Sequence, residues 1–114
     1  EYGYSKRHLY GGNSNPGQWM VGGTLRLFER CRPGVLYADM SACNRYAEGL
    51  ERAAAVRCPT MLVLGRDDRL TPVKSTRDLV AALPSPDVRI LEGAGHTLMV
   101  EAPNGLLDVL RTVL

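Results

Sequence analysis

The hydrophobic positions divide the chain into a helical first half and a second half in which strands and helices alternate. Residues 61–64, Met-Leu-Val-Leu, form a continuous apolar run of strand length, which is typical of a strand inside a parallel sheet. Residues 88–91, Val-Arg-Ile-Leu, predict a second strand, with Arg89 on an exposed side. Because a helical pattern separates the two runs, the sequence predicts a strand–helix–strand unit and an α/β fold with two parallel strands.

Prolines and regularly spaced leucines mark the helices of the second half. Thr71 and Pro72 predict the start of the helix between the strands, with Thr71 as N-cap and Pro72 at the first helical position. Its inward stripe is predicted to contain Leu79, Val80 and Leu83. Pro103 opens a last helix, in which apolar residues recur at spacings of three and four: Leu106, Leu107, Leu110, Val113 and Leu114.

The first half shows helical patterns and no strand alternation. Residues 1–16 predict a loop, because they are rich in Gly, Asn, Ser and Pro. One helix is predicted from Pro16 to about Arg30 and another over about 36–46, followed by a short helical turn. We therefore divide the chain into a helical cap or lid segment with its connector, residues 1–55, and a strand-bearing part, residues 56–114.

Composition restricts the classes of partner. The chain has 114 residues, of which 45% are hydrophobic and 23% charged, as in one small globular domain. A formal net charge of +2 with scattered arginines argues against nucleic acid. No apolar run approaches the roughly 20 residues that span a bilayer, and the sequence shows no signal peptide. We expect neither a nucleic-acid nor a membrane partner.

The three cysteines, Cys31, Cys43 and Cys58, are odd in number and widely spaced. They form no Cys-x-x-Cys pair, so a zinc site is not expected. Reduced thiols in a cytoplasmic protein fit this pattern best. We expect no metal and no cofactor.

An acid and a histidine follow the two predicted strands. Asp67 and Asp68 come after the first strand, and His96 comes after the second. Neighbouring parallel strands end at the same edge of a sheet, where ligands of open α/β sheets bind. A carboxylate there can accept a hydrogen bond from the imidazole and fix its tautomer. Loop geometry alone leaves both aspartates open as the partner, and each is also a common turn residue.

The two loops resemble those of the α/β-hydrolase superfamily. The stretch Gly65-Arg-Asp-Asp68-Arg-Leu-Thr-Pro72 is similar to the acid loop of that family, and Gly95-His96-Thr-Leu-Met-Val-Glu101-Ala-Pro103 is similar to its histidine loop. The resemblance covers roughly residues 56–114, including the lead-in to the first strand. It implies that Asp68, rather than Asp67, is the acid, that His96 is the general base, and that Glu101 helps to hold the histidine loop.

Residues 1–55 resemble the helical cap of that superfamily more weakly. If they form a cap, Trp19, Met20 and Phe28 border a pocket for a small-molecule substrate. The alternative is that these side chains only pack the helices together.

The chain departs from the family in one respect. It contains no Gly-x-Ser-x-Gly elbow for the nucleophile, and Ser14 lies in Gly-Asn-Ser-Asn-Pro without a preceding apolar strand. The resemblance therefore implies the C-terminal part of an α/β-hydrolase fold, completed by a missing N-terminal part of the same chain. Ester hydrolysis is the default reaction, while amide, C–C, halide or acyl-transfer chemistry stays open. The fragment alone is expected to be inactive.

Two non-catalytic alternatives remain. The chain could belong to a hydrolase-like protein that binds a small molecule or a partner, or it could be a stand-alone interaction domain. The residue at the elbow of the missing part would separate the first alternative from an enzyme. Because a two-stranded sheet leaves an open edge and an apolar face, we also expect self-association through that edge.

Overall fold

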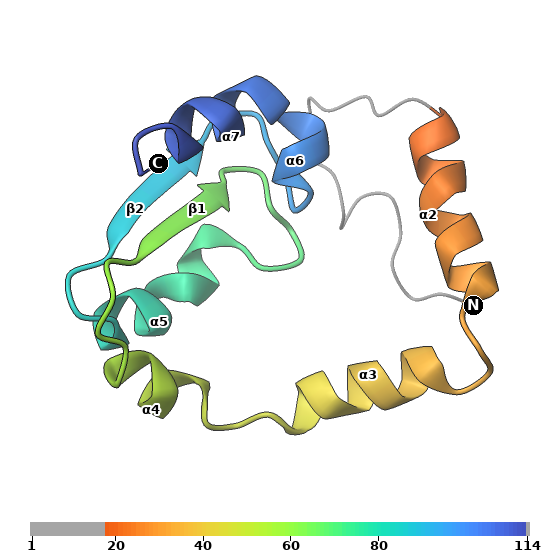
Figure 1. Cartoon of the computed structure of the whole chain (residues 1–114), viewed down its shortest axis with the longest axis horizontal. Helices are drawn as coiled ribbons and strands as arrows, with labels where there is room; N and C mark the ends of the chain where they lie inside the picture. The colour runs from red at the N-terminus through yellow and green to blue at the C-terminus, as the bar shows by residue number, and fades with distance from the viewer. Residues whose placement is uncertain (1–17, 114) are drawn as a thin grey trace.

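The computed structural model describes residues 18–113, so the predicted loop over residues 1–16 lies outside the described residues. Figure 1 shows a two-stranded sheet with helices before, between and after its strands. The elements, in chain order, are α2 (Gln18–Arg30), α3 (Val35–Arg45), α4 (Gly49–Ala54), β1 (Met61–Gly65), the 3₁₀ helix η1 (Val73–Thr76), α5 (Arg77–Ala82), β2 (Asp87–Leu91), α6 (Leu98–Glu101) and α7 (Pro103–Leu110).

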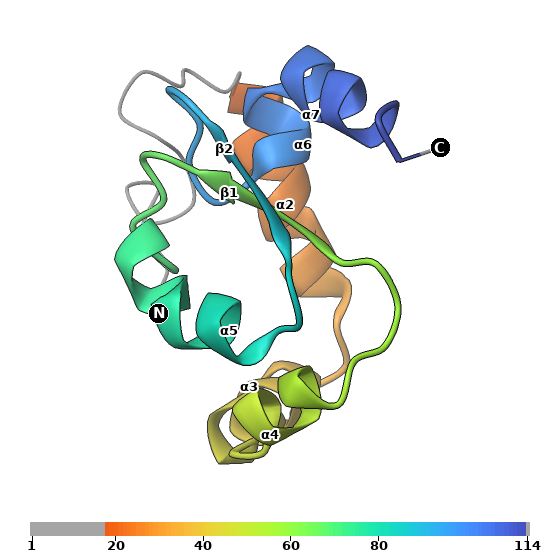
Figure 2. The same cartoon turned by 90° about the vertical axis from the view of Figure 1, so that its left-hand side faces the viewer.

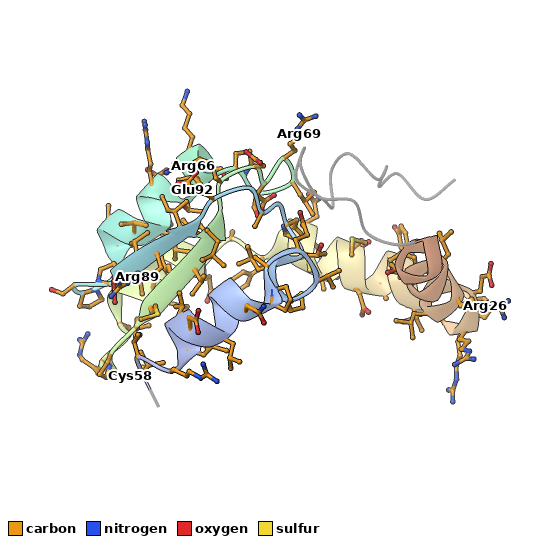
Figure 3. All side chains as sticks on the ribbon, turned by 90° about the horizontal axis from the view of Figure 1, so that it is seen from above. Arg26, Cys58, Arg66, Arg69, Arg89 and Glu92 are labelled. Carbon is orange, nitrogen blue, oxygen red and sulfur yellow. The ribbon has the colours of Figure 1, made fainter. Side chains whose placement is uncertain are left out.

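The two strands are parallel neighbours, as predicted. Their register runs from Met61 opposite Asp87 to Gly65 opposite Leu91, so both strands end at one edge of the sheet. Helices α5 and α7 lie on opposite faces of this sheet (Figures 2 and 3). The predicted α/β fold with two parallel strands and flanking helices is therefore confirmed.

The sheet is only partly covered within the described residues. The apolar residues of β1, 61–64, are half-buried, although their sequence is typical of a strand buried on both faces. The buried hydrophobic residues in the described part of the chain are Ala53, Leu83 and Ala94. Among residues 18–113, β1 pairs with β2 alone, which leaves its other edge without a strand.

The helices of the first half lie apart from the sheet. Figures 1 and 3 show α2 and α3 extending away from the strands, whereas α4 packs against α5. Several apolar side chains of α2 and α3 are accordingly exposed, with Tyr37 on α3 at 79% exposure. No helix within residues 18–113 has the length and apolar character needed to cross a bilayer.

The predicted start of the helix between the strands was wrong. Pro72 precedes the 3₁₀ helix η1 as its N-cap residue, with an extended ψ of 149°, and α5 begins only at Arg77. Thr71 does not cap a helix, because its hydroxyl donates to the Asp68 carboxylate instead. A charged acceptor within the same loop competes successfully with helix capping.

Two features near the C-terminal end also differ from the prediction. The one-turn helix α6 was not predicted, because four residues are too few to show helical periodicity. The last helix begins at Pro103 as expected but ends at Leu110, short of the apolar positions at 113 and 114.

The end of β1 touches the loop that follows β2. A Cβ on Gly65 would lie 2.6 Å from the carbonyl oxygen of Ala94 and would also clash with the carbonyl oxygen of Gly95. Two backbone hydrogen bonds form at this contact, from Arg66 N to Leu91 O (3.0 Å) and from Asp67 N to Ala94 O (2.9 Å). Only glycine permits so close an approach of two backbones.

Gly65→Ala should therefore separate the two loops at the carboxyl edge. Since the added methyl group meets backbone rather than a flexible side chain, we expect a loss of about 1–3 kcal/mol in the free energy of unfolding. Urea unfolding measures this loss. The matched control is Gly23→Ala in α2, where no atom lies within 4 Å of the new Cβ and alanine favours the helix by about 1 kcal/mol. Equal stability of the two variants would contradict the steric role of Gly65.

Candidate active site

The loop after β1 folds around the carboxylate of Asp68. Its Oδ1 accepts hydrogen bonds from the backbone N–H groups of Leu70 (2.8 Å) and Thr71 (2.9 Å). Its Oδ2 accepts a third from the Thr71 hydroxyl (2.8 Å). The Asp68 side chain is only 9% exposed. The carboxylate is thus a structural centre of its own loop as well as a charged group at the sheet edge.

The loop after β2 is held by Glu101, which lies at the end of α6. Glu101 Oε2 accepts a hydrogen bond from Gly95 N (2.8 Å), and Oε1 accepts from Thr97 N (3.1 Å) and the Thr97 hydroxyl (3.0 Å). One carboxylate therefore fixes the backbone on both sides of His96. These bonds agree with the supporting role that the resemblance implied for Glu101.

Asp68 and His96 meet between the two loops. His96 Nδ1 lies 3.0 Å from Asp68 Oδ2, and the His96 side chain is 35% exposed, more than its partner. Asp67 contributes differently: its backbone N–H donates to the Ala94 carbonyl and helps to dock the loops. The structure thus brings Asp68, rather than Asp67, into contact with His96. The catalytic roles of the pair stay predictions.

The surroundings of Asp68 favour its ionised form. Burial by itself raises the pKa of Asp68, but hydrogen bonds from His96, Thr71 and Leu70 outweigh it and hold the pKa below its ordinary value. A carboxylate that stays charged can support a positive charge on the neighbouring imidazole.

An ion pair joins the two loops on the exposed side of the sheet edge. Arg66 Nη2 lies 2.9 Å from Glu92 Oε1, and the Arg66 Nε also donates to the Glu92 carboxylate. The hydrogen bond from Arg66 lowers the pKa of Glu92. Figure 3 shows this pair side by side, whereas Arg69 extends away from the loop. Because both partners of the pair are exposed, its contribution to stability is small.

The residues predicted to border a substrate pocket all belong to α2. The side chains of Trp19 and Met20 lie outside the described residues, while Phe28 is half-buried in the last turn of the helix. Figure 1 shows α2 apart from the two strands. The pocket assignment stays a prediction.

Sequence reasoning missed Thr71 as a member of this site. Its hydroxyl lies 2.8 Å from Asp68 Oδ2 and 3.2 Å from His96 Nδ1. The sequence feature that could have identified Thr71 is its position three residues after Asp68. The proline that follows it, Pro72, favoured a helix cap instead. Within the part of the chain that the structure describes, no group of three or more potential ligand side chains is arranged to hold a metal ion.

Comparisons with known proteins agree with this architecture. The model of one family, described as serine aminopeptidase S33, matches residues 24–103. No curated protein matches the sequence. Among solved structures, one described as the structure of a thermophilic esterase is similar, with a TM-score of 0.68 and 24% identity.

The esterase match covers 88% of this chain but 40% of the esterase chain. The chain thus spans less than half the length of the esterase that it resembles. At that identity the likeness shows the fold alone, which is α/β with two parallel strands and flanking helices. Because the family model matches well over half of the 114 residues, the chain belongs to the serine aminopeptidase S33 family of the α/β-hydrolase superfamily.

Proposed function

We propose that this chain is the C-terminal part of a serine hydrolase that cleaves an ester or a related bond in a small molecule. The observation that carries the proposal is the 3.0 Å contact between His96 Nδ1 and Asp68 Oδ2 at the shared end of two parallel strands. In this proposal residues 56–114 belong to the catalytic core and residues 1–55 to a helical cap. Membership of a hydrolase family supports the class of reaction.

In the proposed mechanism, His96 donates its Nδ1–H to Asp68 and keeps a lone pair on Nε2. That lone pair takes the proton of a serine hydroxyl during attack and returns it to the leaving group. Asp68 stays ionised, orients the imidazole and stabilises the imidazolium. The serine and the oxyanion-stabilising donors would come from another part of the protein, because this sequence has no Gly-x-Ser-x-Gly elbow.

Two substrate classes have support. The similar solved structure is described as an esterase, which favours an ester. The family is described as serine aminopeptidases, which favours an amide next to a free amino group. The same acid–base pair serves both, since each reaction passes through attack by a hydroxyl and protonation of a leaving group. Trp19, Met20 and Phe28 are proposed to border the substrate pocket.

The test is hydrolysis by the protein encoded by the complete reading frame that contains these residues. Activated short-chain esters and amino-acid anilides should separate the two substrate classes. His96→Ala should lower kcat by about 10⁴-fold or more, as for other triad members. The control is His8→Ala, which removes the other of the two histidines in the sequence, lies in the predicted loop over residues 1–16, and should leave kcat unchanged. Full activity in His96→Ala would overturn the proposal. A folded but inactive complete protein would favour the non-catalytic binding alternative. The 114-residue chain alone should show no turnover.

Asp68 should also make stability depend on pH in the acid range. Its folded-state pKa is lowered, so its contribution is complete above the unfolded value of about 3.9. That contribution is lost as the pH falls through the lower folded value. The difference in unfolding free energy between the wild type and Asp68→Asn should therefore shrink in urea titrations as the pH falls below about 4. Asp67→Asn, which removes the same charge one residue away, is the control. A pH-independent difference for Asp68→Asn would contradict the bonding described for its carboxylate.

Glu101→Gln should loosen the loop that presents His96. An amide keeps one accepting oxygen but places an NH₂ group against loop N–H donors. One of those donors loses its partner, at a cost of about 1–3 kcal/mol. We expect faster hydrogen exchange at the Gly95 and Thr97 amides. Glu92→Gln is the matched control, because Glu92 is exposed and pairs with Arg66 instead. Unchanged exchange in Glu101→Gln would argue against its supporting role.

A further inference from the structure

We infer that Thr71 is a positioning residue of this site, whose hydroxyl bridges Asp68 and His96 and fixes the imidazole tautomer with its proton on Nδ1. The inference rests on the proposed function only in giving that tautomer a catalytic purpose. The geometry itself is independent of the reaction.

Three polar atoms form a closed triangle. Thr71 Oγ1 lies 2.8 Å from Asp68 Oδ2 and 3.2 Å from His96 Nδ1, and the third side, from Nδ1 to Oδ2, measures 3.0 Å. Each side of the triangle is within hydrogen-bonding distance. The hydrogens available to the triangle decide which atom donates to which.

The hydrogens can be assigned one by one. Ionised Asp68 has none to give, since the hydrogen bonds around it hold its pKa below the ordinary value. The Thr71 hydroxyl has one hydrogen, and the shorter contact with a charged acceptor directs it to Asp68 Oδ2. A hydrogen between Thr71 Oγ1 and His96 must then come from the imidazole. His96 Nδ1–H therefore lies between the carboxylate and the hydroxyl oxygen as a three-centre donor.

The opposite tautomer is disfavoured by the same contacts. With its hydrogen on Nε2, His96 would turn the Nδ1 lone pair toward an ionised carboxylate at 3.0 Å. The Thr71 hydroxyl could satisfy only one of its two neighbours. The arrangement thus leaves the Nε2 lone pair free, as a general base requires.

Thr71 also fixes the orientation of the carboxylate. Its backbone N–H donates to Asp68 Oδ1 at 2.9 Å, while its hydroxyl donates to Oδ2. A single residue therefore holds both carboxylate oxygens and limits rotation of the carboxylate plane. Pro72 follows directly and restricts the backbone at that point. Thr71 acts through Asp68 and His96 and does not itself touch substrate.

Two substitutions separate the hydroxyl from the shape of the side chain. Thr71→Val keeps the branched shape and the backbone N–H but removes the hydroxyl. Thr71→Ser keeps the hydroxyl and removes a methyl group. If the hydroxyl group holds the tautomer, Thr71→Ser should behave like the wild type, whereas Thr71→Val should not. If only packing matters, serine should fail as valine does.

The experiment uses the complete protein with ¹⁵N-labelled histidine, and the His96 ring signals are identified by their loss in His96→Gln. At a pH where the ring is neutral, the wild type should show the Nδ1–H tautomer. Thr71→Val should lower the fraction of that tautomer and raise the pKa of Asp68, followed in ¹³C-labelled protein. It should also reduce kcat about tenfold, as expected for losing one hydrogen bond to a charged group, with KM unchanged. Thr71→Ser should restore all of these.

An Nε2–H tautomer in the wild type would overturn the inference without any variant. The inference would also be overturned if Thr71→Val kept the wild-type tautomer fraction, Asp68 pKa and kcat. It would be overturned equally if Thr71→Ser changed them as much as Thr71→Val does. The outcomes also separate it from the proposed function. A complete protein that is inactive yet shows the expected tautomer and its response to Thr71 refutes the hydrolase assignment alone. An active enzyme that needs His96 but ignores Thr71→Val refutes the positioning role alone.

Discussion

The site depends on one contact, the approach of the end of β1 to the turn at residues 94–95. Gly65 leaves no room for a side chain there, and Asp67 N–H closes the contact by donating to Ala94 O. Parallel pairing of the strands sets the direction of both loops, but this backbone contact sets the distance between them. A shift of about one ångström would break the hydrogen bond between Asp68 and His96, because donor and acceptor must lie within about 3.2 Å of each other.

Two carboxylates then give the loops their rigidity. Asp68 accepts backbone N–H groups of its own loop, and Glu101 accepts those on both sides of His96. Loops that carry no strand or helix hydrogen bonds need such acceptors for their N–H groups. Glu101 can reach this loop because it ends α6, a one-turn helix that begins directly after the loop. The single turn brings the Glu101 carboxylate back to the backbone around His96.

Much of this architecture could be predicted from the residues, and the misses have physical causes. The strands, α3, α7 and the Asp68–His96 pairing followed from apolar runs, from Pro103 and from the spacing of two motifs. Local rules predict a helix cap at Thr71, because threonine is a common N-cap residue and proline is favoured at the first helical position. Its true partner, His96, lies 25 residues away. A local sequence pattern cannot identify a contact between residues so far apart in the chain. The choice between Asp67 and Asp68 also could not be made locally and required the family motif.

Both the half-buried strand β1 and the Asp68–His96 pair are consistent with a larger α/β hydrolase of which this chain is one part. β1 has the composition of an interior strand, yet its apolar residues are only half-buried and one edge carries no partner strand among residues 18–113. The pair lies at the end of the same sheet, with His96 Nδ1 turned toward Asp68 Oδ2 and Thr71 Oγ1. Under the proposed function, the remainder of an α/β hydrolase would supply both the neighbouring strands for this edge and the nucleophile on which His96 acts. The chain's coverage of 40% of the similar esterase is consistent with a remainder of that size.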